Sequence, residues 1–152
     1  MIKLITFVLL CTIAGYTDLK KLQIPNWITL PGILLGLIFS IIYKDITLIN
    51  SITSCAAGVL FFGLIAIIGK TILKKEALGF GDVKLITMIG TFWGIEKMIF
   101  IIFYSTLVAL LSTIILVILK KQKIHSPIPY GFYISIVSIV YLLKGIRDLL
   151  FT

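Results

Sequence analysis

Six apolar segments follow one another along the chain, and all charged residues except Lys84 lie between these segments or beyond the first and last of them. The apolar runs are continuous and do not alternate as the strands of a membrane β-barrel would. Since a helix needs about 20 residues to cross a bilayer, the pattern predicts an all-α, polytopic membrane protein with about six transmembrane helices. We expect a single membrane-embedded domain over residues 1–152. The segments are Leu4–Thr17, Pro25–Tyr43, Leu48–Gly69, Val83–Gly94, Met98–Leu119 and Ile128–Leu143.

The first, fourth and sixth segments are shorter than a full span. Either they thin the membrane, or their ends continue the helix through polar residues at the interface. The fourth segment is the weakest of the six predictions. The opening MIKLITFVLLCTIAG resembles a secretory signal, with a lysine, an apolar stretch and small residues. Because its cleavage site is poor, we expect a first helix that is retained.

Composition and charge agree with a membrane protein. The chain is 60% hydrophobic with a mean hydropathy of +1.19, whereas soluble domains are about 45–50% apolar. The net charge of +8 comes from lysines scattered singly or in pairs, which indicates a topology signal rather than nucleic-acid binding. Cys11 and Cys55 lie inside apolar runs and form no CxxC pair, so no zinc or redox cofactor is expected.

The basic residues predict an orientation. With six spans, the first, third and fifth connections share one side and hold nine of the fourteen basic residues, while five lie on the other side. The positive-inside rule places the richer side in the cytoplasm and both termini outside. Asp45 then falls in a short outer connection, where solvent can hold it.

Two aspartates stand at segment ends on the predicted cytoplasmic side. Asp18 closes the first apolar run and Asp82 opens the fourth. A carboxylate in a membrane segment costs about 2.5–3.5 kcal/mol at the bilayer centre and less near the boundary, so it is a functional candidate. Asp18 could instead end a helix in water and pair with Lys20 or Lys21.

Asp82 has a simpler interpretation of its own, as an N-cap that favours the positive end of a helix dipole. Gly79 and Gly81 precede it, and each glycine costs roughly 0.5–1 kcal/mol in a helix interior relative to alanine. Glycine permits left-handed dihedrals and a close backbone approach. A carboxylate that faces a bound peptide needs that space.

Together the two aspartates permit aspartyl-protease chemistry. Two carboxyl groups a few ångströms apart share one proton, because they do not both ionise easily. One can act as a general base on water while the other polarises the scissile carbonyl, without a metal. The sequence holds no HExxH motif, recognisable serine–lysine pair or phosphate loop that would favour other chemistry.

Three stretches carry a family resemblance. DLKKLQIPNWIT at Asp18–Thr29 has an aspartate, a basic residue and Ile-Pro-Asn. LGFGDVKL at Leu78–Leu85 contains a full GxGD motif, and IPYGFYISI at Ile128–Ile136 has a proline, an aromatic residue and a glycine at the start of a helix. With these motifs in order, the chain resembles the type IV prepilin peptidases, which include the archaeal preflagellin peptidases and belong to the GxGD aspartyl membrane proteases.

The resemblance implies that Asp18 and Asp82 are the catalytic pair of a peptidase in the cell membrane. It would cleave a prepilin, pseudopilin or preflagellin at the cytoplasmic face, between a short basic leader and the hydrophobic helix that follows. We expect no cofactor and no nucleic-acid partner. Pro25 is expected to start a helix, and Lys84 to steady the charge of Asp82 or reach lipid. Pro129 and Gly131 are expected to break the last helix at its cytoplasmic end and to let it pack closely on the helices that carry the aspartates. The expected supporting residues are Gly79, Gly81, Lys84, Pro25, Asn26, Pro129 and Gly131.

Two departures from the family pattern are visible. Many bacterial relatives carry an insertion with paired CxxC motifs and methylate the new N-terminus, and this chain lacks those motifs. It resembles the minimal form, so we expect no methyltransferase activity. Phe132 stands where many relatives have proline. Two other readings stay open: a small proton-coupled transporter or channel subunit with Asp18 and Asp82 as a proton relay, and a catalytically silent assembly protein.

Overall fold

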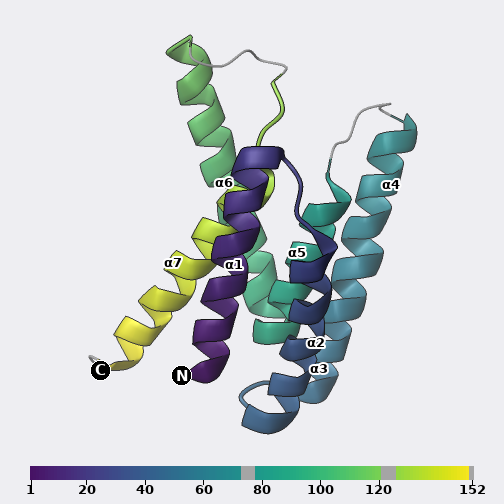
Figure 1. Ribbon diagram of the computed structural model, residues 1–152, viewed down its shortest axis with the longest axis vertical. Helices are drawn as coiled ribbons and strands as arrows, with labels where there is room; N and C mark the ends of the chain where they lie inside the picture. Colours follow the sequence, from purple (N-terminus) through teal and green to yellow (C-terminus); the bar gives the residue numbers. More distant parts are fainter. Residues whose placement is uncertain (73–77, 121–125, 151–152) are drawn as a thin grey trace.

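The protein is a bundle of helices in the computed structural model, which describes residues 1–72, 78–120 and 126–150. No strand occurs among these residues. The all-α, polytopic prediction is therefore confirmed (Figure 1). The elements are α1 (Ile2–Lys21), α2 (Asn26–Tyr43), α3 (Leu48–Ala57), the π-helix η1 (Gly58–Phe62), α4 (Gly63–Ile72), α5 (Phe80–Trp93), α6 (Ile95–Ile118) and α7 (Tyr130–Leu150).

Four helices in the described part of the chain are long and apolar enough to cross a membrane. They are α1, α2, α6 and the 25-residue unit formed by α3, η1 and α4. The first segment reaches 20 residues because the helix continues past the apolar run through Asp18 to Lys21. α7 contributes a shorter apolar stretch, Tyr130–Leu143.

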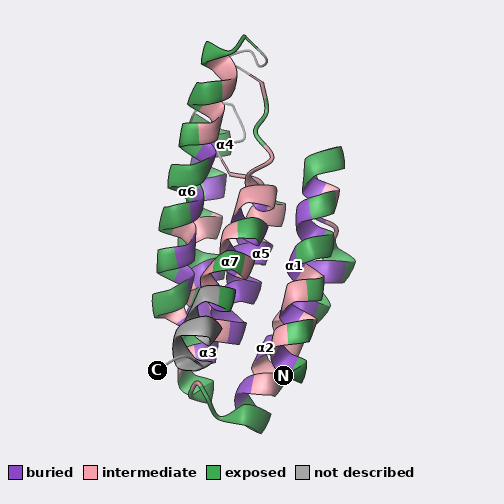
Figure 2. Cartoon of the chain, turned by 90° about the vertical axis from the view of Figure 1, so that its left-hand side faces the viewer, coloured by how far each residue is buried: buried purple, intermediate pink, exposed green. Residues whose placement is uncertain are grey.

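The short fourth segment forms α5, which lies inside the bundle. Nine of its 14 residues are buried, and it packs against α2, α3, η1, α4, α6 and α7. Figure 2 shows buried residues along α5, while the outer surface of α6 is largely exposed. Because other helices surround α5, it need not present a long surface to lipid, and an apolar sequence on all sides suits that position.

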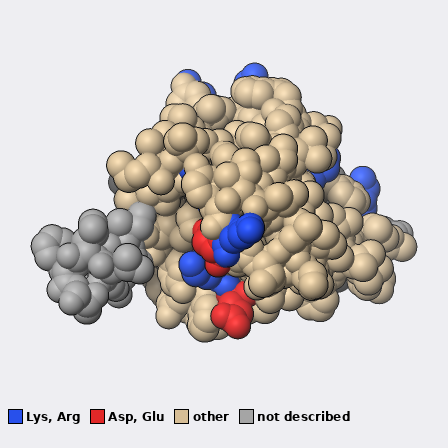
Figure 3. Space-filling model, turned by 90° about the horizontal axis from the view of Figure 1, so that it is seen from below, with Lys and Arg blue, Asp and Glu red and all other residues tan. Residues whose placement is uncertain are grey.

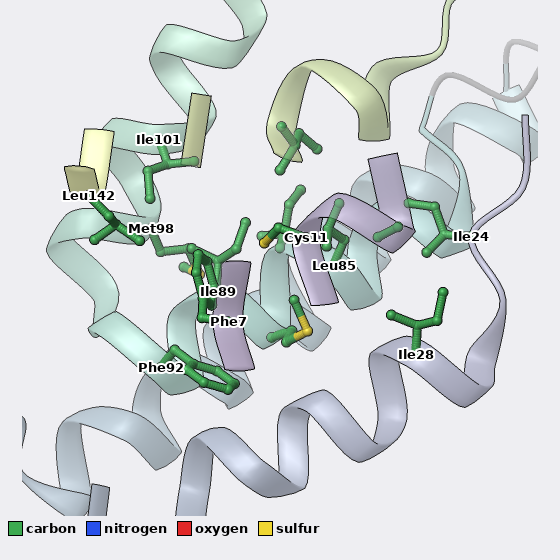
Figure 4. Close-up of a cluster of buried hydrophobic side chains, with 14 residues drawn as sticks. Phe7, Cys11, Ile24, Ile28, Leu85, Ile89, Phe92, Met98, Ile101 and Leu142 are labelled. Atoms are coloured by element: carbon green, nitrogen blue, oxygen red, sulfur yellow. The ribbon is translucent and has the colours of Figure 1, made fainter. Parts of the chain in front are cut away.

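An aromatic contact joins α1 and α5. The ring centroid of Phe7 lies 5.2 Å from that of Phe92 and 5.6 Å from that of Trp93, within the buried cluster of Figure 4. α1 and α5 run in opposite directions (Figure 1). Asp18 is eleven residues after Phe7 and Asp82 is ten before Phe92, so the helices carry them about 16 and 15 Å from this contact. Both aspartates therefore reach the same end of the bundle.

The opposite end of the bundle holds an ion pair. Lys3 is 5% exposed, and its Nζ lies 2.7 Å from Asp45 Oδ2 and 4.7 Å from the ring centroid of Trp93. Asp45, which was expected to be stabilised by solvent, is thus partly exposed and also forms an ion pair with Lys3. Seen from this end, basic and acidic side chains meet near the middle of a largely uncharged face (Figure 3).

Candidate active site

Asp18 lies in the last turn of α1, where it faces the start of α7. Its side chain is almost fully buried, and its Oδ2 accepts a hydrogen bond of 3.0 Å from the backbone N–H of Phe132. Lys20, one of the alternative partners predicted for Asp18, lies over the ring of Tyr16 instead, 4.5 Å from the centroid. Asp18 is therefore held by the N-terminus of another helix, whose positive dipole end favours a negative charge.

Asp82 lies in the first turn of α5, whose N-cap is Gly79 rather than Asp82 itself. The backbone amide of Gly79 interacts with its carboxylate. The other oxygen, Oδ1, is buried and has no hydrogen-bond partner in the described structure. A buried polar atom without a partner is unfavourable by about 1–3 kcal/mol. The N-cap interpretation of Asp82 is therefore wrong, and the Gly79 amide leaves the buried Oδ1 of Asp82 without a partner.

Gly131 brings the two aspartates together. A Cβ atom at this position would lie 2.9 Å from Asp82 Oδ1, 3.1 Å from Asp18 Cγ and 2.5 Å from Ile24 Cδ1. Asp82 Oδ1 and Asp18 Cγ are therefore no more than about 6 Å apart. Any side chain at residue 131 would push into both carboxyl groups, so glycine is the residue that allows this arrangement.

The two glycines before Asp82 act through close approach rather than unusual dihedrals. A Cβ on Gly81 would lie 3.1 Å from Ile24 Cβ, and one on Gly79 would lie 3.0 Å from Asp82 Oδ2. Among the glycines that the structure describes, only Gly94 has a positive φ. Gly81 therefore lets the connection between α1 and α2 pack against the first turn of α5.

A cavity of about 220 Å³ opens beside the aspartates. Its walls come from the connection after α1 and from the start of α5. This volume holds several water molecules or a short piece of peptide, since one water occupies about 30 Å³ in the liquid. The lining residues are Asp18, Leu22, Gln23, Ile24, Gly79, Phe80, Gly81 and Asp82.

Several expected supporting residues lie around this site without facing it. Pro25 directly precedes α2 with a φ of −70°, which agrees with its predicted role as a helix starter. Lys84 donates a hydrogen bond of 2.6 Å from Nζ to Asn26 Oδ1. The partner of Lys84 is therefore the start of α2, and neither it nor Asn26 lines the cavity.

The expected roles of Pro129 and Gly131 are met in part: Pro129 bounds the last helix at this end, and Gly131 allows close packing without breaking the helix. α7 begins at Tyr130, directly after Pro129, and Gly131 lies inside its first turn. The proline ends the preceding extended stretch, since a residue without an N–H fits just before a helix. Sequence reasoning also missed the backbone N–H of Phe132, because a backbone donor leaves no mark on the residue type.

Asp82 lies outside the four long spans, in a largely apolar setting. Burial, followed by the negative charge of Asp18, raises the pKa of the Asp82 carboxyl to about 7, although the amide of Gly79 opposes this change. Asp82 therefore keeps its proton under mildly acidic conditions. The site therefore combines one neutral carboxyl and one hydrogen-bonded carboxyl beside a cavity that has space for several water molecules.

Comparison with known proteins settles the family. The sequence model of the type IV leader peptidase family matches residues 5–117. The chain belongs to this family. The matched region contains Asp18 and Asp82, so the family resemblance predicted from the three motifs is confirmed.

Individual relatives agree with this assignment. The chain is 30% identical over 142 residues to the prepilin leader peptidase/N-methyltransferase of Aeromonas hydrophila, which covers 93% of the chain and 48% of the relative. It is 30% identical over 128 residues to the protein of the same name from Pseudomonas aeruginosa, covering 84% and 44%. For the Pectobacterium carotovorum protein of that name, the identity is 29% over 133 residues, covering 88% and 47%. The chain thus spans slightly less than half the length of these curated relatives. No solved structure matches it.

Proposed function

We propose that this chain is a membrane aspartyl endopeptidase with Asp18 and Asp82 as its catalytic pair. The observation that carries the proposal is the meeting of two carboxyl groups from helices far apart in the sequence, within about 6 Å and beside an open cavity. Membership of the type IV leader peptidase family supports peptidase activity. The proton-relay alternative favours carboxylates near mid-membrane, whereas these two share one end of the bundle.

The surroundings of the two aspartates suggest a division of roles. Asp18 accepts the Phe132 N–H at the positive end of α7, which favours its ionised form. Asp82 has a buried oxygen without a hydrogen-bond partner, which favours a proton on that side chain. Asp18 would take a proton from a water in the cavity as the water attacks the scissile carbonyl. Asp82 would donate its proton to the carbonyl oxygen, which gives a tetrahedral diol. As the C–N bond breaks, the proton on Asp18 would pass to the leaving amine, and a hydroxyl of the diol would return a proton to Asp82.

The proposed substrate is a prepilin, pseudopilin or preflagellin with a basic leader and a hydrophobic helix. The names of the relatives include prepilin leader peptidase, and the excess of lysines on the side of the two aspartates supports cleavage at the cytoplasmic face. Both termini would then lie outside. We propose peptidase activity alone for these 152 residues, because their two cysteines form no CxxC motif.

The test is cleavage of a prepilin-like substrate by the purified full chain in lipid vesicles, with the new N-terminus identified by mass spectrometry. Asp18→Asn and Asp82→Asn should both abolish cleavage while the protein still inserts into the membrane. Glu96→Gln is the matched control, because Glu96 is an exposed acid in the first turn of α6, near the other end of the bundle. An aspartate variant that cuts at the wild-type rate would remove that residue from the proposed pair.

A further inference from the structure

A second and larger cavity lies on the outside of the bundle, between η1 and α6. It has a volume of about 620 Å³ and is lined almost entirely by apolar side chains. We name it the α6 groove. Its principal lining residues are Phe61 and Phe62 of η1 and Met98, Ile102, Phe103 and Thr106 of α6.

A widened helical turn forms one wall of the α6 groove, opposite the first half of α6. The wide π-helical turn of η1 lies between α3 and α4 and presents two phenylalanines to the groove. Such turns are rare in regular helices and occur frequently at functional sites.

One end of the α6 groove is connected to the aspartates. Thr106 lines the groove, and its hydroxyl shares a hydrogen bond of 2.8 Å with the hydroxyl of Tyr130. Tyr130 directly precedes Gly131, where an added Cβ would lie against both carboxyl groups. A chain of direct contacts therefore runs from the groove to the site.

Asp82 and Thr106 also lie at similar distances from the turn that joins α5 to α6. α5 and α6 meet at Gly94 and run in opposite directions (Figure 1). Asp82 is 12 residues before Gly94 and Thr106 is 12 residues after it, so each lies about 18 Å along its helix from this turn. From Thr106 the groove extends about 16 Å along α6 to Ile95, toward the opposite end of the bundle.

This geometry matches a polypeptide whose polarity changes at the cleaved bond. The lining of the cavity beside the aspartates combines the two acidic side chains and Gln23 with a few apolar residues, whereas the lining of the α6 groove is almost entirely apolar. A peptide that crosses the aspartates would place a polar segment in the cavity beside them and an apolar helix in the α6 groove. Without an aqueous driving force, helices associate in a bilayer through van der Waals packing, which a preformed groove supplies.

We propose that the α6 groove binds the hydrophobic helix of the substrate, directly after the scissile bond, while the smaller cavity holds the leader side. This inference rests on the proposed function. It adds a binding surface on η1 and α6 that fixes where a transmembrane substrate enters and which bond reaches the aspartates.

The test places a photo-crosslinking phenylalanine derivative at residue 102, inside the groove, in the full chain with Asp82→Asn to keep the substrate uncut. Residue 110 carries the same derivative as the control, because Leu110 is an exposed α6 residue outside the groove. In vesicles with a prepilin-like substrate, residue 102 should crosslink to the hydrophobic helix of the substrate at least about fivefold more than residue 110. Equal crosslinking, or crosslinks to lipid alone, would overturn the proposal.

A second measurement uses cleavage by otherwise unaltered enzyme. Ile102→Trp fills the groove and should raise KM for the full-length substrate about tenfold, whereas Leu110→Trp should leave KM within about twofold of the wild type. If wild-type enzyme cuts no substrate, the proposed function itself has failed. If wild-type enzyme cuts and both tryptophan variants behave alike, only the groove assignment is wrong.

Discussion

The two ends of the α1–α5 pair hold buried charged residues in opposite arrangements. Lys3 and Asp18 are both 5% exposed. Lys3 has an oppositely charged partner, Asp45, at 2.7 Å, whereas Asp18 lies beside a second acidic side chain, Asp82. Burial alone does not distinguish these two ends. The sign of the neighbouring charge does, because opposite charges stabilise one another and like charges do not.

The comparison separates a structural site from a functional one. Removing one member of a buried ion pair leaves an uncompensated charge and lowers stability. Removing one of two neighbouring carboxylates relieves repulsion instead. A substitution at the aspartate end should therefore lower activity and leave the free energy of unfolding unchanged or higher. A substitution at the lysine end should lower the free energy of unfolding and leave activity unchanged.

The largest expected effect is on catalysis at the aspartate end. Asp82→Asn should reduce the rate of leader cleavage by about a thousandfold or more, since it removes a group that transfers protons. Thermal unfolding in detergent should show a stability equal to or above that of the wild type, because a buried carboxyl without a full set of partners is lost. A variant that is both inactive and strongly destabilised would indicate a structural role for Asp82.

The next effect concerns the glycine between the two carboxyl groups. Gly131→Ala should lower the cleavage rate by about a hundredfold, because the new methyl group overlaps the positions of both aspartates and misplaces them. Gly63→Ala is the control, since no atom lies within 4 Å of its added Cβ. The proposed geometry is wrong if the two variants have equal activity.

At the opposite end, Asp45→Asn should destabilise the fold without changing the chemistry. The expected loss is about 2 kcal/mol, less than the 3–5 kcal/mol of a fully buried pair, because the Asp45 side chain is 45% exposed. Equilibrium unfolding measures this loss, and cleavage assayed well below the midpoint temperature should match the wild type. An active-site defect in folded Asp45→Asn would contradict the separation of the two ends.

The raised pKa of Asp82 should make the free energy of unfolding depend on pH. The pKa of Asp82 is raised to about 7 in the folded chain, so its proton favours the folded state. This stabilisation is complete below about pH 4, the ordinary range of an aspartate, and is lost as the pH rises through 7. Cleavage should also decline above about pH 7, where the pair loses its shared proton. Asp82→Asn should remove this stability change, which unfolding measurements between pH 4 and pH 8 would detect.

The smallest effect is expected at the exposed hydrogen bond between Lys84 and Asn26. Lys84→Ala should change stability by about 0.5–1.5 kcal/mol and cleavage by no more than a few-fold, because the bond joins two helices outside the cavity. A double-mutant cycle with Asn26→Ala isolates the pair. A loss of activity close to that of Asp82→Asn would show that Lys84 acts on the carboxylate.

Much of the architecture was predictable from the sequence because apolar length and helix rise are local properties. The order of helices, the positions of Asp18 and Asp82 at segment ends and the family motifs could all be read directly. The enclosed position of α5 could not. In a chain that is 60% hydrophobic, residues that face lipid and residues that face the core are both apolar, so periodicity does not tell them apart.

The two acidic residues of the site were predictable from the sequence, but the contacts of the residues around them were not. Gly131 was expected to help break the last helix and to allow close packing; it lies in the unbroken first turn of α7, where a side chain would press on both aspartates. Lys84 was expected near Asp82 or lipid and binds Asn26. These contacts join segments far apart in the chain, and spacing along the sequence carries no information about them.

The sequence by itself determined that two acidic residues stand at helix ends on one side of a membrane bundle, because a charge is unfavourable in hydrocarbon and each helix has a fixed rise per residue. Only the tertiary structure decided that the two meet. The contact of Phe7 with Phe92 joins α1 and α5 at one end, and the missing side chain of Gly131 leaves space for both carboxyl groups at the other. Proximity of this kind depends on how helices pack, which no single segment encodes.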